Sequence, residues 1–463
     1  MAAPENVITP KNDPARLDKV VNLCKRRGFV FPSGEIYGGT RSAWDYGPLG
    51  VELKENIKRQ WWKAMVTGRE DVVGLDSSVI LPRQVWVASG HVGVFNDPLV
   101  ECTNCHKRFR ADTLAEEYVE RTGKAASESD LSDVPCPNCG NRGQYTEPRD
   151  FNMMLKTYLG PVESEEGLHY LRPETAQGIF VNFLNVQTTS RRKPPFGIGQ
   201  MGKSFRNEIT PGNFIFRTRE FEQMEMQFFV KPGTDAEWFE RWRELRMSWH
   251  HALGLAPAKL RWHEHGPTEL AHYARAAYDI EYEFPFGWNE IEGIHNRGDF
   301  DLGRHQQHSG KKLEYFDQGA GERYLPFIVE TSAGADRVTL TVLVDAYREE
   351  QVEGETRVVL GFHPAVAPIK AAILPLVKKD GMPELAMAAY DDMRKRFPCF
   401  YDDSGAIGRR YRRMDEAGTP FCVTVDGESL VERTVTVRHR DSMQQDRVSL
   451  DRLAGFLEDA LRG

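Results

Sequence analysis

Residues 202–230 constrain the fold of this chain more than any other segment. Residues 202–208 and 215–230 are both typical of strands, and the loop between them contains Pro211 and Gly212. Because side chains alternate between the two faces of a strand, the pattern predicts a hairpin with one apolar and one polar face. The apolar face comprises Phe216, Met224, Met226 and Phe228, and the polar face Ser204, Arg206, Glu208, Arg217, Arg219, Phe221, Gln223, Glu225 and Gln227.

The polar face has the composition of a nucleotide-binding surface. It carries three arginines, whose guanidinium groups bind phosphate oxygens in pairs, and an aromatic ring on which a base can stack. A merely solvated strand would more often alternate charges of opposite sign. The chain has no GxxxxGK[ST] sequence, and Gly197–Gly202 satisfies GxGxxG only ahead of a strand. We therefore expect a nucleoside triphosphate pocket without a P-loop.

The composition is that of an ordinary globular protein. With 40% hydrophobic and 28% charged residues it is not a disordered, fibrous or coiled-coil chain, and its 463 residues predict about three domains. Seven cysteines are too few for a disulfide-stapled secreted scaffold, and a net charge of −8 gives no sign of a nucleic-acid partner. With no signal or transit peptide and no apolar run of ~18 residues, we expect a cytoplasmic protein without a membrane partner.

Four cysteines predict a metal site. Cys102 and Cys105 form one CxxC pair and Cys136 and Cys139 another, both within the polar segment 101–150. A spacer of two residues lets one tight turn present two thiolates to a tetrahedral zinc ion. Four thiolates leave no open coordination position, so the zinc would be structural. The alternatives are four free thiols or a redox function.

The other segments differ in pattern. Residues 42–63 predict a turn followed by a helix, residues 72–82 alternate like a strand, and residues 234–324 open with an amphipathic helix. From residue 363 onward, strands and helices alternate as in a compact α/β domain. The strands expected there are 371–377, 400–403, 421–425 and 434–439, and the helices are 382–396, 407–417 and 448–461.

These segments contain, in order, motifs that resemble those of the class II aminoacyl-tRNA synthetases. Arg206–Glu208 with Arg217–Glu225 resembles motif 2, Glu330–Arg337 resembles motif 3, and Val72–Pro82 resembles motif 1, the dimer-interface element. Within that family the resemblance is to the dimeric glycyl-tRNA synthetases of bacterial and eukaryotic type, and it covers the chain from about Leu17 to the C-terminus. The motifs that carry it are Glu35–Gly39, Tyr46–Gly50, Ala88–His91, Leu171–Gly178, Arg219–Glu225, Glu292–Ile294 and Asp299–Asp301.

The resemblance implies a fold and an activity. It implies an α+β catalytic domain, 1–362, on a mixed, mainly antiparallel sheet, with a zinc-binding insertion at 101–150 and an inter-motif insertion at 234–324. It also implies a C-terminal α/β anticodon-binding domain, 363–463. The activity implied is that of a homodimeric, cytoplasmic glycine–tRNA ligase, which converts glycine and ATP to glycyl-adenylate with Mg²⁺ and transfers glycine to the 3′ end of tRNA(Gly) in protein biosynthesis.

The resemblance also implies an ATP site. Arg206 would bind the α-phosphate and, with Arg337, act as a catalytic residue, while Arg217 and Arg337 would contact the γ-phosphate. Phe221 would stack on adenine and Glu290 could hold magnesium. The ATP-binding residues implied are Arg206, Asn207, Glu208, Phe216, Arg217, Thr218, Arg219, Glu220, Phe221, Glu290, Ile291, Gly334, Ala335, Asp336 and Arg337.

Glycine has no side chain to hold, so carboxylates would bind its ammonium group and the protein would fill the space of a side chain. Glu174, Glu225 and Glu330 are the main candidates, with Glu292 possible. Thr331 stands where the family usually has proline, which makes the start of motif 3 less rigid. The glycine-site residues implied are Arg110, Glu174, Phe221, Glu222, Gln223, Met224, Glu225, Glu330, Thr331, Ser332, Ala333 and Gly334.

The C-terminal segment contains a basic stretch, Ile407–Arg413, followed in sequence by Arg438, His439 and Arg440. These residues are either a tRNA-facing strip or a solvated helix face. Two other functions remain open: a related synthetase of another amino-acid specificity, or a synthetase-like binding protein that has lost the chemistry. The glycine-type motifs argue against the first, and the presence of the motif 2 and motif 3 arginines argues against the second.

Overall fold

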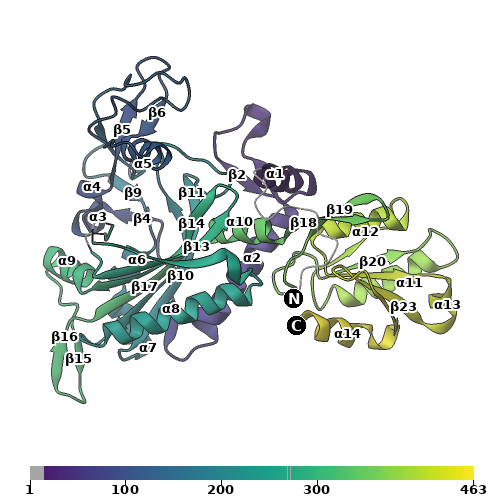
Figure 1. The fold of residues 1–463 in the computed structure, drawn as a ribbon. Helices are drawn as coiled ribbons and strands as arrows, with labels where there is room; N and C mark the ends of the chain where they lie inside the picture. The colour runs from purple at the N-terminus through teal and green to yellow at the C-terminus, as the bar shows by residue number, and fades with distance from the viewer. Residues whose placement is uncertain (1–14, 268, 272, 463) are drawn as a thin grey trace.

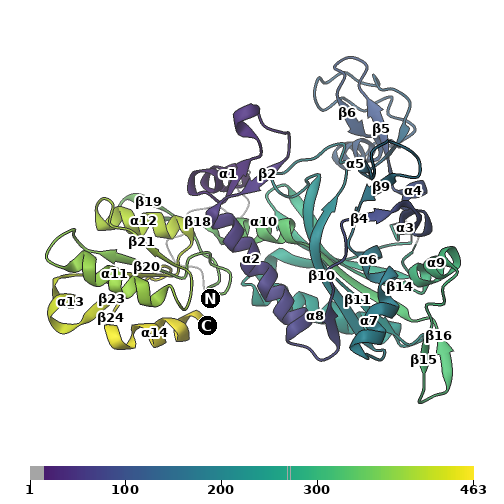
Figure 2. The ribbon, with the colours of Figure 1, turned by 180° about the vertical axis from the view of Figure 1, so that it is seen from behind.

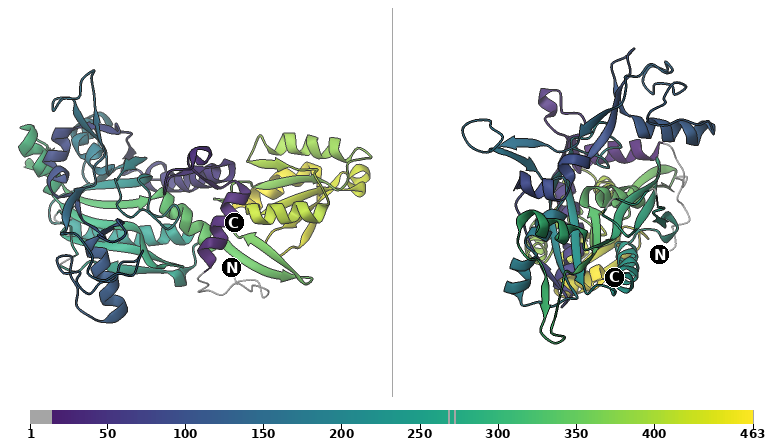
Figure 3. Two further views of the ribbon diagram at one scale, coloured as in Figure 1. Left: turned by 90° about the horizontal axis from the view of Figure 1, so that it is seen from above. Right: turned by 90° about the vertical axis from the view of Figure 1, so that its left-hand side faces the viewer.

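The computed structural model describes residues 15–267, 269–271 and 273–462. Two bodies, each with its own main sheet and apolar cluster, lie side by side (Figures 1 and 3), and the N-terminal segment lies between them in the view from above. Within the described residues, no helix has both the length and the apolar character needed to cross a membrane.

A seven-stranded sheet forms the centre of the larger body, in the order β12-β13-β14-β17-β11-β10-β3. Neighbouring strands are antiparallel except β10 and β3, which are parallel. The expected mixed, mainly antiparallel sheet is confirmed. Its strands are β3 (Val72–Gly74), β10 (Phe196–Phe205), β11 (Glu220–Val230), β12 (Leu260–Glu264), β13 (Ala276–Phe284), β14 (Gly287–Gly298) and β17 (Phe327–Gly334).

One face of this sheet is apolar and buried under helices. Met224, Met226 and Phe228 pack with Trp61 and Trp242 in the largest apolar cluster, as the hairpin pattern predicts. The helices that cover this face are α2 (Pro48–Trp62), which runs diagonally in front of the sheet in Figure 2, α8 (Asp235–Ala252) and α10 (Ala335–Ala346). At one end of the opposite face lie α6 (Ala176–Val181), α7 (Phe183–Ser190) and α9 (Phe300–Ser309). The remainder of that face is polar.

The prediction of one strand over residues 72–82 is wrong, because the segment forms two separate strands. β3 joins the seven-stranded sheet, whereas β4 (Ile80–Pro82) pairs with β9 (Leu168–Leu171) in a separate three-stranded sheet with β8 (Lys156–Tyr158). Two side chains bind the backbone of the segment between β3 and β4: the amide of Ser77 donates to Gln200, and Arg172 donates to the carbonyl of Ser77. The chain therefore leaves one sheet and enters the next.

Residues 101–150 project from the larger body at the top of Figure 1. A small apolar cluster around Leu114 and Tyr118 lies within this segment and extends to Val100 just before it. Their elements are β5 (Asn96–Glu101), β6 (Arg108–Arg110), α5 (Ala111–Thr122) and β7 (Arg149–Asn152).

Residues 234–324 supply three strands of the central sheet, β12, β13 and β14, in addition to α8, α9 and a short hairpin. The hairpin is β15 (Tyr315–Asp317) and β16 (Glu322–Tyr324). The segment is therefore integral to the sheet on which the polar face lies.

The C-terminal body has a five-stranded sheet in the order β21-β20-β22-β23-β24. The expected strands and helices are present, and α13 and β24 are additional. Apolar residues of α11 and α14 pack on one face, around Val423 and Leu457, and Met414 of α12 packs on the other. The elements are β20 (Ala371–Pro375), α11 (Met382–Met393), β21 (Cys399–Tyr401), α12 (Ile407–Ala417), β22 (Phe421–Val425), α13 (Gly427–Glu432), β23 (Thr434–His439), β24 (Gln445–Ser449) and α14 (Leu450–Arg462).

A hairpin of β18 (Tyr347–Val352) and β19 (Glu355–Leu360) joins the two bodies. Arg357 on β19 is fully buried, and its guanidinium donates to Asp415 at 2.8 Å and to Glu350 at 2.6 Å. The remaining elements are α1 (Arg16–Arg27), β1 (Val30–Pro32), η1 (Glu35–Tyr37), β2 (Trp44–Tyr46), η2 (Lys63–Thr67), α3 (Arg83–Ala88), α4 (His91–Val94) and η3 (Pro257–Lys259).

Candidate active site

The predicted hairpin is present, but β10 ends at Phe205, before the expected 208, and β11 begins at Glu220, after the expected 215. The β10–β11 ladder ends at the pair Phe205 and Glu220, and residues 206–219 form a loop over the end of the sheet. The backbone bond from the Gly212 amide to the Arg217 carbonyl closes this loop. The strict alternation of faces therefore stops at Glu220, and Phe216, expected on the apolar face of a strand, reaches the pocket from the loop.

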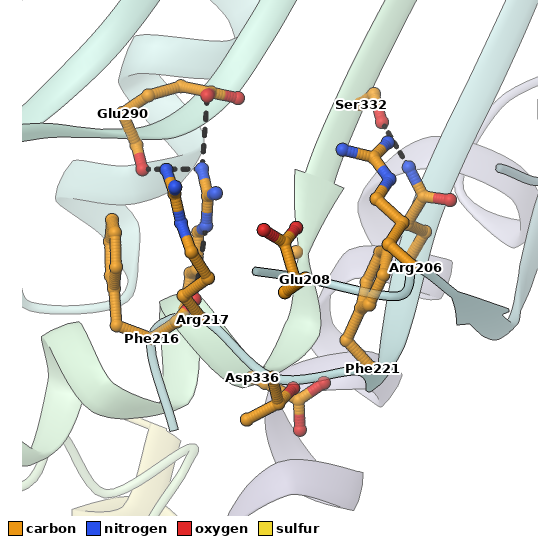
Figure 4. Close-up of a pocket in the computed structure, with 12 residues that line it drawn as sticks. Arg206, Glu208, Phe216, Arg217, Phe221, Glu290, Ser332 and Asp336 are labelled. Atoms are coloured by element: carbon orange, nitrogen blue, oxygen red, sulfur yellow. Dashed lines mark hydrogen bonds and ion pairs between the residues drawn. The ribbon is translucent and has the colours of Figure 1, made fainter. Parts of the chain in front are cut away.

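The loop, β11, β14, β17 and the start of α10 line a partly open pocket (Figure 4). Every residue that lines it belongs to the sites expected from the sequence. They are Arg206, Glu208, Phe216, Arg217, Thr218, Phe221, Gln223, Glu290, Ser332, Gly334, Asp336 and Arg337.

Arg337, in the first turn of α10, forms one wall of the pocket. Its Nη1 donates to the Glu290 carboxylate at 3.0 Å and to the Glu290 carbonyl at 3.2 Å. Its guanidinium lies 4.5 Å from the centre of the Phe216 ring. These contacts fix the guanidinium plane before any ligand enters.

Arg206 lies across the pocket, next to Phe221 (Figure 4). Its guanidinium is 5.2 Å from the centre of the Phe221 ring and 5.4 Å from that of Phe95, and its Nε donates to the Pro173 carbonyl at 3.0 Å. Among the described residues this is its one hydrogen bond, so both Nη groups are available to an anion.

The charges in the pocket favour an anionic ligand. Burial lowers the pKa of Arg217, and the positive charges of Arg337 and Arg110 act in the same direction, against the opposing charges of Glu208 and Asp97. Positive charges that crowd one another in this way are relieved by a polyanion. The buried Glu208 has an Oε2 atom without a partner among the described residues, so it can accept a hydrogen bond from a ligand.

Deeper along the same face, three carboxylates share one hydrogen-bond network. The Gln227 amide donates both to Glu225 at 2.8 Å and to Glu330 at 2.6 Å. Glu225 also accepts from the Thr175 hydroxyl, and Glu174 accepts from Gln177 at 3.0 Å. Glu225 and Glu330 lie farther along β11 and β17 than Gln223 and Ser332, which line the pocket, and none of the three carboxylates lines it.

The three carboxyl groups differ in protonation. Burial, and then the charges of Glu330 and Glu174, raise the pKa of Glu225 well above its usual range. Burial acts the same way on Glu330, but Arg297 and His295 outweigh it and lower the pKa of Glu330 to about 2. The effect of burial on Glu174 is likewise outweighed, mainly by His91, so its pKa is low. The network therefore holds a neutral Glu225 beside two anions.

Comparison with known proteins decides the family. Glycine–tRNA ligases from Cutibacterium acnes (61% identical, 96% of this chain and 97% of that protein), Bifidobacterium longum (60%, 96% and 92%) and Streptomyces coelicolor (58%, 97% and 99%) match nearly end to end. This chain belongs to the glycine–tRNA ligase family. Residues 370–460 also match the family model described as an anticodon binding domain. The family is one of aminoacyl-tRNA synthetases, so the class of enzyme expected from the motifs is confirmed.

Several residues expected in the ligase site lie on the other face of the sheet. Met224, Thr331 and Ala333 are buried on the apolar side, and Ile291 packs in the same core. Glu222 points away from the pocket to Lys54 at 3.2 Å and to Lys58 at 2.6 Å. The alternation of strand side chains accounts for these positions, because Gln223 and Glu225 occupy the site face.

The prediction that Glu292 could bind the ammonium group of glycine is wrong. It is fully buried under the sheet, where it accepts from Arg246 at 2.5 Å and contacts His250 at 2.7 Å. The cause is a bulge at Ile291, the extra residue between the pairs Ile280–Glu292 and Glu281–Glu290. It leaves Glu290 at the pocket and turns Glu292 toward α8.

Other expected residues lie around the pocket or beneath it. Arg219 and Glu220 line a neighbouring depression, where Arg219 donates to the Glu208 carbonyl at 3.0 Å. The amide of Asn207 donates to the Met153 carbonyl at 2.8 Å, and Ala335 is buried at the start of α10. Arg110 lies on β6, paired with Asp97 at 3.1 Å and Asp112 at 2.6 Å.

The four cysteines of 101–150 converge as a metal site requires. Their Sγ atoms all lie within 4.8 Å of one another, with Cys102–Cys139 and Cys105–Cys136 each at 3.7 Å. A tetrahedron with Zn–S distances of about 2.3 Å has edges of about 3.8 Å. The two turns match, since the amides of His106 and Gly140 donate to the carbonyls of Cys102 and Cys136, both at 2.8 Å.

Three of the arginines that were interpreted as either a tRNA-facing strip or a solvated helix face are buried and fit neither interpretation. Arg410 is buried and donates to the carbonyls of Pro375 and Leu376. Arg438 is buried against Asp415, and Arg440 donates to the carbonyls of Gly418 and Phe362. These guanidinium groups satisfy backbone oxygens and a buried acid, so they hold the body together.

Sequence reasoning assigned no role to the basic side chains that contact the acidic network. His91 lies 3.4 Å from Glu174, His295 is 2.7 Å from Glu330, and Arg297 donates to Glu330 at 2.9 Å. His91 lies within a motif that carried the family resemblance, and Arg297 lies two residues before another. A search for basic residues near these motifs would have found His91 and Arg297.

Proposed function

We propose that the chain acts as a glycine–tRNA ligase in two steps at the pocket of Figure 4. Glycine attacks the α-phosphate of ATP to give glycyl-adenylate and diphosphate, and the 3′-terminal ribose of tRNA(Gly) then takes the glycyl group and releases AMP. The observation that carries this proposal is the convergence of Arg206, Arg217 and Arg337 on one pocket beside a buried acidic network. No covalent intermediate with the protein is needed, so positioning and charge stabilisation supply the rate.

The arginines account for recognition of ATP. In this proposal Arg206 contacts the α-phosphate with its Nη groups and neutralises the charge that develops there, while Arg217 and Arg337 bind the γ-phosphate. Phe221 carries Arg206 over its ring and stacks on adenine, whose amino group donates to Glu208. Phe216 supports Arg337.

Magnesium would neutralise charge on the phosphates. Glu290 supplies a carboxylate at the pocket, next to Arg337, and oxygen ligands of this kind suit Mg²⁺.

The acidic network accounts for recognition of glycine. In this proposal the ammonium group of glycine binds beside Glu174, Glu225 and Glu330, on the side of Gln223 and Ser332 that faces away from the phosphates. Arg110, at the side of the pocket, would contact the bound substrate. The close packing of the network leaves no volume for a larger side chain, which would reject other amino acids by steric clash.

The remaining features support an enzyme of several parts. We propose a catalytic domain at 1–362, an anticodon-binding domain at 363–463, a structural zinc ion on Cys102, Cys105, Cys136 and Cys139, and a homodimer in the cytoplasm. For zinc, the support is a set of four thiols spaced like the edges of a tetrahedron.

The test is exchange of labelled diphosphate into ATP with a panel of amino acids. Glycine alone should support exchange, and tRNA(Gly) should then be charged. Arg206→Ala should abolish exchange, whereas the matched control Arg323→Ala, on the β15–β16 hairpin, should retain it. Exchange with another amino acid, with none, or undiminished in Arg206→Ala would refute the assignment.

A further inference from the structure

His295 lies where it can orient one carboxylate of the acidic network. It is on β14, and Glu330 faces it from the neighbouring strand β17. Its Nδ1 donates to Oε1 of Glu330 at 2.7 Å. Because the pKa of Glu330 is lowered to about 2, the carboxylate is an anion and the hydrogen of this bond belongs to the imidazole.

One of the two carboxylate oxygens of Glu330 is held by His295. Its Oε2 accepts from both Gln227 at 2.6 Å and Arg297 at 2.9 Å, so two donors hold that atom. Among the described residues, His295 is the one donor to Oε1. A carboxylate offers about four acceptor positions, so the described donors leave one for the ammonium group of a ligand, on the oxygen that His295 orients.

Gly293 provides the space for this imidazole. A Cβ atom at Gly293 would lie 2.9 Å from Cε1 of His295, closer than such contacts occur, and 3.3 Å from Nε2, closer than most. The ring therefore lies over Gly293, and a carboxylate oxygen of Asp279 is 3.4 Å from the same Cβ position. Asp279 is in turn held by His265 at 2.8 Å. Glycine is required here by the ring that covers it.

We propose that His295 is a positioning residue for the glycine-binding carboxylate Glu330, and that Gly293 is a glycine because any side chain would displace the imidazole. This inference rests on the proposed function. It assigns His295 no contact with the reacting atoms. The consequence is a selective one: loss of this hydrogen bond weakens the binding of glycine and leaves the binding of ATP, at the other end of the pocket, unchanged.

The experiment compares three variants in glycine-dependent diphosphate exchange. His295→Leu keeps much of the volume but has no donor, and its KM for glycine should rise roughly tenfold to a hundredfold, as expected for a lost bond to a charged group. His295→Asn places an amide nitrogen near the position of Nδ1 and should restore most of the affinity. Gly293→Ala keeps the imidazole but moves it, and should raise the KM for glycine as well.

Gly303→Ala is the matched control, since its Cβ would meet only Leu325 at an ordinary 3.7 Å. The KM for ATP should stay within about twofold of the wild-type value in every variant. Equal KM values for glycine in His295→Leu and wild type, or in Gly293→Ala and Gly303→Ala, would overturn the positioning role. A rise in both KM values, or no rescue by His295→Asn, would also overturn it. Wild-type protein without glycine-dependent exchange would instead refute the proposed function. Should His295→Leu fail to fold, Gly293→Ala decides.

Discussion

Replacement of Glu225 by glutamine separates the effect of the acidic network on the free energy of unfolding from its role in binding glycine. Glu225 is 1% exposed, and its oxygen and that of Glu330 lie at most about 5.4 Å apart, because they share the Gln227 amide at 2.8 and 2.6 Å. Two ionised carboxylates at that distance repel by about 3 kcal/mol at an effective dielectric constant near 20. Glutamine keeps the shape and the neutral state but cannot ionise, and its amide can donate to Thr175.

The effect depends on pH with a definite sign. Since burial and two neighbouring carboxylates raise the pKa of Glu225, the folded protein retains a proton that the unfolded chain loses near pH 4.5. Glu225 therefore contributes its full stability below that pH, and the contribution falls as the pH rises toward the folded pKa. Glu225→Gln lacks this loss, so at pH 8 its free energy of unfolding should exceed that of wild type by about 1–3 kcal/mol. At pH 4.5 the difference should be small.

The measurement is denaturant unfolding at several pH values, followed by tryptophan fluorescence. All nine tryptophans lie between Trp44 and Trp288, so this signal reports only on the larger body. Glu117→Gln, at an exposed position of α5, controls for loss of a carboxylate elsewhere. Glycine-dependent exchange should disappear in Glu225→Gln despite its higher stability. A less stable variant, or a pH-independent difference, would refute the neutral state of Glu225, and retained exchange would refute its role in binding glycine.

Three further predictions follow from the same contacts. Since glycine binding should displace the proton of Glu225, the KM for glycine should fall as the pH rises in wild type; a flat profile would contradict this. Arg337→Lys loses the fixed guanidinium plane beside Glu290, so kcat/KM for ATP should fall about tenfold to a hundredfold relative to Arg323→Lys, with the KM for glycine unchanged. Cys136→Ser should lose the bound zinc by metal analysis and expose residues 101–150 to proteolysis; wild type without zinc would contradict the site.

The pocket was predictable from sequence because its chemistry is local. Residues of β11 alternate with a period of two, and the motifs on β17 and α10 are contiguous, so Gln223, Ser332 and Arg337 reach one cavity without long-range information. Where the ladder ends, the alternation ends too. Phe216 belongs to a loop, and its position next to Arg337 depends on packing that periodicity does not encode.

The bulge at Ile291 shows a second limit. Glu290 and Glu292 are two residues apart, and a regular strand would place both on one face. One extra residue instead sends Glu290 to Arg337 and Glu292 to Arg246, so that two similar glutamates have unrelated environments. Nothing in the local composition distinguishes a strand with a bulge from one without, since the register is set by the partner strand β13.

Charge counts are the weakest guide, both for the whole chain and for single segments. A net charge of −8 suggested no nucleic-acid partner for a member of a tRNA ligase family. The stretch Ile407–Arg413 suggested a cationic strip, yet Arg410 donates to three backbone carbonyls and Arg413 is paired with Asp402. A guanidinium that is already desolvated and paired releases no counterions when RNA approaches. The exposed Arg409 and the partly exposed Arg412 and Arg413, and not the number of arginines in the stretch, are therefore what this helix can offer to a phosphate.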